Sequence, residues 1–218
     1  PLSVRKVRFR LQGRAHAADG ELKVELKLLR RDAEPHLWQP LDTATLTLAA
    51  KQPTATHKRT FRSPIDGSVQ YYAVVPAKRS EPVPEKGSEN ETESEVAKLT
   101  PKPALILTLH GAGVEAIGQA NAYLPKDWAQ IVAPTNRRPF GFDWEDWGRL
   151  DAIEVLDLVE RQLAPSATYL TGHSMGGHGA WQVGAHYPDR FAAIGPSAGW
   201  VSMWSYAGAR RAEHQPPV

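Results

Sequence analysis

The feature that most constrains this chain is the stretch TGHSMGGHGAW at residues 171–181. It places Ser174 between Gly172 and Gly176 at the spacing of a nucleophile elbow, a sharp turn that joins a strand to a helix and exposes the serine hydroxyl. Glycines are needed there because side chains two residues before and after the serine would collide with neighbouring strands. The motif alone is a weak pattern, so its surroundings decide whether Ser174 is a nucleophile or part of an ordinary glycine-rich turn.

The sequence around this motif alternates between strand and helix patterns. Continuous apolar runs, typical of strands buried on both faces, occur at 104–113, 130–136, 167–172 and 191–199. Helical periodicity occurs at 143–163 and 176–188. This alternation predicts an α/β fold with a mostly parallel sheet and crossover helices on both faces. Because a predicted strand precedes the motif and a predicted helix follows it, we favour the elbow over the ordinary turn.

The first part of the chain has a different pattern. Alternating apolar residues predict antiparallel strands at 6–12, 21–29 and 43–50, with turn residues at 16–20. We interpret residues 1–57 as a small β accessory domain that packs on something else, because three strands are marginal alone. A further hairpin with Asp66 and Gly67 at its turn is predicted at 58–77, where the second domain, 58–218, begins.

A polar insertion interrupts the second domain at residues 78–103. It is rich in Pro, Glu, Ser and Thr and has almost no apolar residues. Such a segment cannot bury enough apolar surface to offset the entropy of ordering, so we expect a flexible, solvated insertion. Asn90 begins an N-glycosylation triplet, a pattern that also occurs by chance.

Composition excludes several classes of protein. The net charge of +2 and the scattered basic residues argue against nucleic-acid binding. Without cysteine there is no disulfide, thiolate metal site or cysteine nucleophile, and we expect no metal and no cofactor. The longest apolar runs are too short to span a membrane. The compartment and the oligomeric state stay open, although we favour a periplasmic or secreted location.

Two backbone groups are candidates for binding an oxyanion. The helix that follows the elbow points its N-terminal N–H groups at the site of developing negative charge, so the N–H of Met175 is one candidate. The second is the N–H of Ala112 in LHGAG, at the end of the strand predicted at 104–109. Taken alone, LHGAG could be only a tight turn that ends a strand.

The histidines do not provide an obvious catalytic base. His110 and His173 lie close to the motifs, but we expect His110 to brace a loop and the side chain of His173 to leave the turn in another direction. We expect His178 and His186 to pack or to face solvent. In FDWEDWG, we expect Trp147 in the core and Asp143 at the helix N-cap, although this stretch could also line the pocket.

Taken together, LHGAG, NRRPFGFDWEDWGRLDAIEVLD, GHSMGGHGAW and YPDRFAAIGPSAGW resemble the α/β-hydrolase superfamily. More narrowly, the chain resembles bacterial prolyl-oligopeptidase-type peptidases and esterases with an N-terminal β extension. The resemblance covers residues 58–204 and implies that Ser174 is the nucleophile and Met175 an oxyanion donor. It implies less for Ala112, since peptidase members of this group can use a tyrosine instead.

The resemblance also implies an acid and a histidine that follow later strands, in the order Ser, acid, His. Neither is found in this chain. Asp189 lies at the exit of the elbow helix, on the wrong side of its loop, and no strand precedes Glu213 and His214 to position them. We therefore expect a hydrolase fold whose C-terminal strands are missing here, and a chain that is inactive by itself.

Three functions remain open from the sequence. A serine esterase acting through an acyl-enzyme on a small-molecule ester is favoured, because the β extension is too short to form a propeller that filters peptides. The alternatives are a serine peptidase of the prolyl-oligopeptidase type and a hydrolase-like binding module without catalysis.

Overall fold

The computed structural model describes residues 20–31, 38–78, 102–138, 140–141 and 143–202. The chain divides into two compact units, Pro1–Ala55 and Thr56–Val218. Several expectations fall outside the described residues: the strand at 6–12, the turn at 16–20 except Gly20, the Asn90 triplet, almost all of the insertion, and Glu213 with His214.

The first unit contains a two-stranded antiparallel sheet of β1 (Gly20–Arg31) and β2 (Trp38–Ala50). Leu22 pairs with Leu48 and Val24 with Leu46, so these apolar side chains share one face. The predicted alternation is confirmed, but burial is slight: Leu22 is 49% and Leu28 61% exposed. Within the described residues, this sheet has no buried core of its own.

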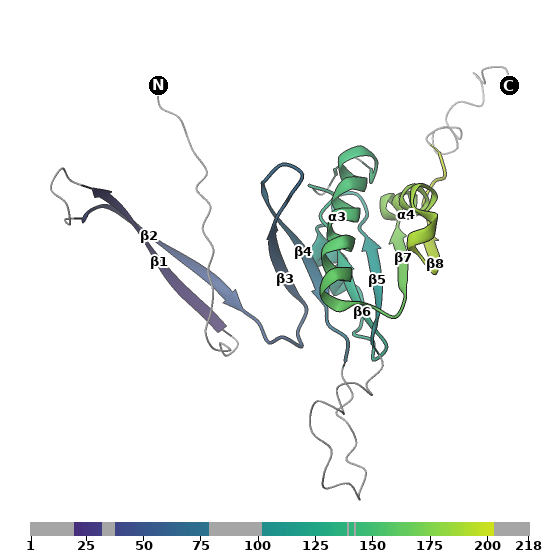
Figure 1. Ribbon diagram of the computed structural model, residues 1–218, viewed down its shortest axis with the longest axis horizontal. Coiled ribbons are helices and arrows are strands. Elements are labelled where there is room, and N and C mark those ends of the chain that lie inside the picture. The colour runs from purple at the N-terminus through teal and green to yellow at the C-terminus, as the bar shows by residue number, and fades with distance from the viewer. Residues whose placement is uncertain (1–19, 32–37, 79–101, 139, 142, 203–218) are drawn as a thin grey trace, which may run out of the picture. The chain divides into compact units, whose positions relative to one another are not determined.

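The second unit is built on a six-stranded mixed sheet (Figure 1). Its strands are β3 (His57–Arg62), β4 (Val69–Val75), β5 (Ala104–Leu109), β6 (Ala129–Ala133), β7 (Thr168–His173) and β8 (Ala193–Ser197). The spatial order is β3-β4-β6-β5-β7-β8. β6, β5, β7 and β8 are parallel, and the β3–β4 hairpin adds antiparallel to β6. The predicted opening hairpin and parallel sheet are both confirmed.

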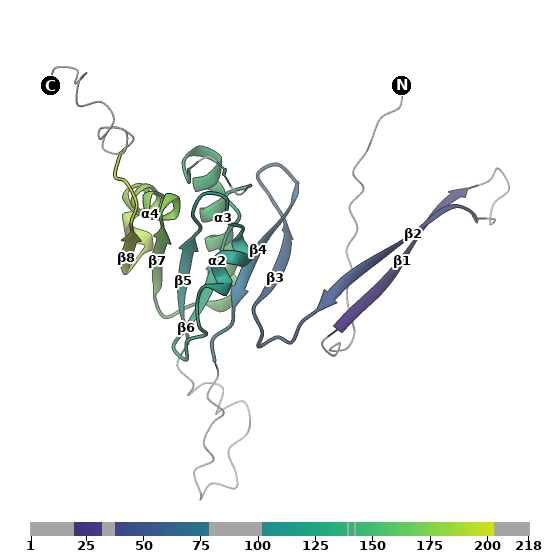
Figure 2. The same ribbon diagram turned by 180° about the vertical axis from the view of Figure 1, so that it is seen from behind.

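Helices cover both faces of this sheet. α3 (Asp146–Leu163) and α4 (Met175–His186) pack on one face with the larger core cluster, which includes Leu105, Leu107 and Leu170. α2 (Ala116–Asn121) packs on the other face against Ala73 and Ile131, as the reverse view makes clear (Figure 2). The short α2 was not predicted from the sequence. A 3-10 turn, η1 (Pro188–Arg190), leads from α4 towards β8.

Two expectations for the start of α3 were wrong. Trp144, not Trp147, is the core tryptophan: Trp144 is fully buried and Trp147 is 40% exposed. The N-cap of α3 is Glu145, not Asp143, because the helix begins two residues later than the acidic pattern suggested. Asp146 lies in the first turn of α3, as expected, where its charge favours the helix dipole.

Candidate active site

Ser174 is the residue that joins β7 to α4. Its backbone angles, φ 56° and ψ −121°, lie outside the regions that L-residues normally adopt, so the turn is strained. Its N–H donates to the carbonyl of Ser197 at 2.9 Å, and its carbonyl accepts from the N–H of Gly177 at 2.8 Å. The end of β8 and the first turn of α4 therefore hold the strained conformation in place.

The glycines on either side of Ser174 are required by close backbone approaches. A Cβ added at Gly172 would collide with the carbonyl group of Gly176, and a Cβ at Gly176 would collide with that of Leu109. A steric reason for glycine is present at both positions, but the obstacle is a neighbouring strand, as expected, only at Gly176; at Gly172 it is the first turn of α4. The close approach of Gly176 to Leu109 places the start of α4 directly against the end of β5.

Met175 is the first residue of α4 and is buried. The first N–H groups of a helix have no intrahelical acceptor, and the helix dipole makes this end partly positive. The backbone N–H beside Ser174 thus lies at a helix terminus that favours negative charge.

The loop after β5 lies beside the elbow. A Cβ added at Gly111 would be 3.5 Å from Cβ of Ser174. The carbonyl oxygen of Gly111 accepts from the N–H of Val114 at 3.2 Å and lies 2.9 Å from Nδ1 of His110. Because C=O and the following N–H point in opposite directions across a trans peptide, the N–H of Ala112 points away from these partners. Ala112 itself is exposed.

His110 braces this loop rather than facing Ser174. Its ring is fully buried, with Nδ1 2.9 Å from the carbonyl oxygen of Gly111 and Nε2 3.0 Å from that of Thr135. Carbonyl oxygens can only accept, so both ring nitrogens are directed at acceptors. His110 therefore links the loop after β5 to the loop after β6.

The other described histidines near the elbow also have partners elsewhere. Nδ1 of His173 lies 3.3 Å from Oγ of Ser197. His178 was expected either to pack or to face solvent; it is buried, and its Nε2 lies 2.9 Å from Glu145 Oε1. His186 is exposed and contacts Arg149. Among the described residues, no histidine is hydrogen-bonded to the hydroxyl of Ser174.

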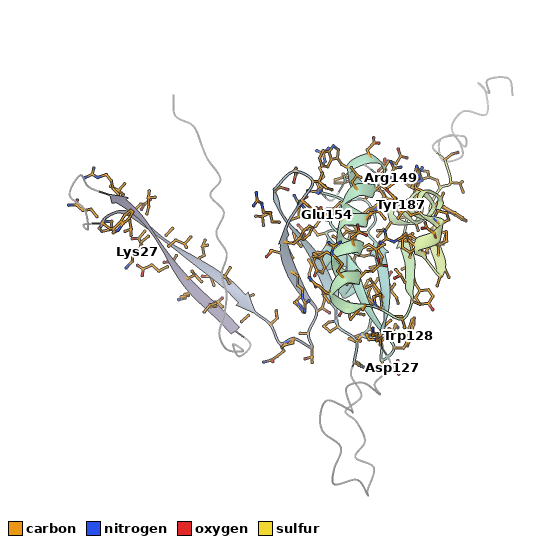
Figure 3. All side chains as sticks on the ribbon, viewed as in Figure 1. Lys27, Asp127, Trp128, Arg149, Glu154 and Tyr187 are labelled. Carbon is orange, nitrogen blue, oxygen red and sulfur yellow. The ribbon has the colours of Figure 1, made fainter. Side chains whose placement is uncertain are left out.

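A buried charge cluster that the sequence analysis missed lies at the same edge of the sheet, after β6. Arg137 Nη2 is 2.8 Å from Glu154 Oε2, and Arg137 Nε is 3.1 Å from Asp151 Oδ1. Oγ of Ser63 donates to Glu154 at 2.6 Å, and Glu154 projects from α3 towards the β3–β4 hairpin (Figure 3). Arg137 also approaches Asp66 in that hairpin, at 3.6 Å. We call these residues, Ser63, Asp66, Arg137, Asp151 and Glu154, the Arg137 cluster.

The pKa values of the two aspartates in the Arg137 cluster are shifted in opposite directions. Burial raises the pKa of Asp151 above its ordinary value, although the Arg137 guanidinium and hydrogen bonds from Thr135 partly offset this. Hydrogen bonds from the side chain and backbone of Ser68 lower the pKa of Asp66. Asp151 and Glu154 lie at i and i+3 on α3, a helical spacing, but nothing in the sequence predicts that Arg137 of the preceding loop pairs with them.

A cavity of about 230 Å³ opens beside the Arg137 cluster. Its lining residues are Gln70, Tyr71, Glu115, Ala116, Thr135, Arg137 and Arg138. Ser174 does not line it. Across the described ranges, no group of acidic residues and histidines is arranged to hold a metal ion, and no helix is long and apolar enough to cross a membrane.

The family of the chain follows from its match to a family model. The family model named Esterase matches residues 83–216, more than half of the chain, and includes the elbow and the loop after β5. The chain belongs to the esterase family. Its mixed sheet and its covering helices match the α/β-hydrolase fold, as the sequence predicted.

Individual relatives of this esterase family chain are distant. A secreted protein of Arthroderma benhamiae is 29% identical over 183 residues, which cover 77% of this chain and 18% of the relative. The solved structure of FphF, a fluorophosphonate-binding serine hydrolase of Staphylococcus aureus, is 19% identical with a TM-score of 0.51. The match covers 68% of this chain and 58% of FphF, and it establishes a shared fold. S-formylglutathione hydrolase of the same bacterium is 18% identical with a TM-score of 0.49, over 71% of this chain and 61% of that one.

Proposed function

We propose that the full-length protein is a serine esterase that acts on a small-molecule ester with Ser174 as its nucleophile. The observation that carries the proposal is the strained backbone of Ser174 at the head of α4, held between two glycines that admit no side chain. Strain of this kind persists only where the surroundings over-determine it, and it occurs most often at active sites.

The chemistry follows from this geometry. Oγ of Ser174 attacks the ester carbonyl carbon while a base takes the hydroxyl proton, and the carbonyl oxygen becomes an oxyanion. The N–H groups of Met175 and Ala112 would donate to that oxyanion. The alcohol leaves with the proton from the base, and water then hydrolyses the acyl-enzyme by the same two steps.

Among the described residues, no histidine is hydrogen-bonded to the hydroxyl of Ser174. A serine hydroxyl is a weak nucleophile at its ordinary pKa and depends on a positioned base. We therefore assign the base and its acid partner to parts of the full-length protein outside the described residues. The chain spans less than two thirds of FphF and about a fifth of the Arthroderma benhamiae protein.

Ester hydrolysis is the preferred activity because the chain belongs to the esterase family. The peptidase alternative differs only in the leaving group, an amine in place of an alcohol. Parallel assays of the full-length protein with p-nitrophenyl acetate and with an amino-acyl p-nitroanilide separate the two. Faster turnover of the anilide would favour the peptidase.

A non-catalytic binding module is the second candidate, and one observation favours it. Among the described residues, no histidine engages the hydroxyl of Ser174, so the elbow could be retained without a base. Labelling with a fluorophosphonate probe decides between the candidates, because a poised serine reacts and an idle serine does not. Labelling that is lost in Ser174→Ala supports the enzyme, and no labelling of the full-length protein supports the binding module.

A further inference from the structure

Trp144 connects the two elements that carry the proposed oxyanion donors. It precedes α3, is fully buried, and has φ 65°, a left-handed conformation that is rare for a bulky side chain. It lies neither on a strand nor in a helix, so regular hydrogen bonding does not explain its position. Its contacts run instead to the loop after β5 and to α4.

The first contact is with the loop that contains Ala112. Nε1–H of Trp144 donates to the carbonyl oxygen of His110 at 3.0 Å, and the indole packs edge-on against the His110 ring at a centroid distance of 4.9 Å. This hydrogen bond fixes the peptide between His110 and Gly111. The next peptide is fixed by His110 Nδ1 and the N–H of Val114, which leaves the N–H of Ala112 pointing away from them.

The second contact is with the helix that begins at Met175. A Cβ added at Gly179, one turn further along α4, would collide with the indole of Trp144. The ring therefore lies directly against the backbone of α4. One rigid side chain thus touches both the loop of Ala112 and the helix of Met175.

We propose that Trp144 is a positioning residue of the oxyanion hole, which sets the spacing between the N–H of Ala112 and the N–H of Met175. This inference rests on the proposed function. Donors aimed at an oxyanion act only if their positions are fixed before the reaction, because reorganisation would cost what the interaction gains. A fully buried indole with one directed hydrogen bond is suited to fixing them.

The test compares Trp144→Phe with Trp147→Phe in the full-length protein. Phenylalanine keeps an aromatic ring at 144 but removes the donor to the His110 carbonyl. Trp147 is the matched control, because it lies three residues away, is 40% exposed and has its ring near the guanidinium of Arg137. Measurements are kcat and KM for p-nitrophenyl acetate, and the inhibition constant of an alkyl trifluoromethyl ketone.

We expect kcat to fall by about 10- to 100-fold in Trp144→Phe with little change in KM, since displaced donors weaken the transition state more than the bound substrate. Affinity for the trifluoromethyl ketone should fall by a similar factor, because its hemiketal oxygen occupies the oxyanion hole. Trp147→Phe should leave both quantities at the wild-type level.

If Trp144→Phe does not fold, replacement of Trp144 by benzothienylalanine removes the N–H and keeps the shape of the ring. Wild-type kcat and inhibitor affinity in a folded donor-less variant would overturn the inference, even with a lowered melting temperature, because Trp144 would then be structural only. Absence of Ser174-dependent turnover in the wild-type protein would instead overturn the proposed function, and this inference with it.

Discussion

The elbow at Ser174 and the Arg137 cluster lie at the same edge of the sheet and hold their backbones in different ways. Both contain a non-glycine residue with positive φ, Ser174 at 56° and Arg137 at 61°. At the elbow, backbone hydrogen bonds and the absence of side chains at two glycines maintain the strain. At the cluster, buried carboxylates engage the arginine from several sides.

This difference shows how strain serves two purposes in one fold. Most donors of Arg137 engage side chains within the protein, so we interpret it as a brace, although its Nε has no hydrogen-bond partner among the described residues. Ser174 is held by its backbone alone, so no described side chain occupies its hydroxyl. Of these two strained positions, only Ser174 presents a side chain that is left available for chemistry.

Ser174→Ala gives the largest expected effect and tests the functional half of the comparison. In the full-length protein, we expect ester hydrolysis to fall by about 10⁴- to 10⁶-fold, since the nucleophile and its partners act as one unit. The melting temperature should hardly change, because the backbone bonds that hold the elbow remain. Initial rates with p-nitrophenyl acetate measure the first effect and thermal unfolding the second.

Arg137→Met tests the other half of the comparison, that the Arg137 cluster serves as a structural brace. Removal of the guanidinium leaves Asp151 and Glu154 buried without their counter-ion, so we expect a loss of about 3–5 kcal/mol in the free energy of unfolding. Urea denaturation of the folded chain measures it.

Arg190→Met is the matched control, because Arg190 also contacts two carboxylates, Asp157 at 2.7 Å and Glu160 at 2.6 Å, but is 26% exposed. Because these two ion pairs are more exposed to solvent, they should contribute about 0.2–1 kcal/mol to the free energy of unfolding. Equal losses for the two arginines would contradict the view that burial makes the Arg137 cluster a brace.

Gly176→Ala tests whether the elbow requires a residue without a side chain at this position. The new Cβ would collide with the carbonyl of Leu109, so we expect a loss of about 1–3 kcal/mol in unfolding free energy, with reduced ester hydrolysis. Gly195→Ala is the control on β8, where the new Cβ would make an ordinary contact at 3.6 Å with Thr171. A Gly176→Ala variant as stable and active as Gly195→Ala would refute the steric argument.

The smallest expected effect is a difference in pH dependence within the Arg137 cluster. Burial raises the folded pKa of Asp151 above the unfolded value of about 3.9, so the stability it contributes is present below that value and is lost as pH rises through the folded pKa. The unfolding free energy of the wild type relative to Asp151→Asn should therefore fall over that range.

Asp66 should show the opposite slope, because its folded pKa is lowered. Its contribution is present above the unfolded value and is lost as pH falls through the folded pKa. Denaturation of Asp66→Asn and Asp151→Asn across the acidic range measures both slopes. Slopes of the same sign would show that one of the two environments is misassigned.

Much of the fold could be predicted from local pattern. The strands β5, β6 and β7 and the helices α3 and α4 follow from apolar runs and helical periodicity, because each buries a regular face. β8 was also predicted, but as a strand buried on both faces; among the described strands it lies at the edge of the sheet, and its residues are mostly exposed. α2 escaped prediction because six residues are too few to establish a helical period. Trp147 was predicted to be buried in place of Trp144 for a similar reason. Trp144 precedes the helix, so helical periodicity gives no information about its burial.

The sequence by itself indicated the elbow and the α/β-hydrolase fold, because the motif and the strand and helix patterns around it are local, although the steric demand at Gly176 comes from Leu109 on β5. Tertiary structure alone decided which side chains meet across the chain. The contact of Trp144 with His110 joins residues 34 apart, and that of Ser63 with Glu154 joins residues 91 apart. Such pairs carry no periodic signal, since their proximity depends on how strands are ordered in the sheet and not on spacing along the chain.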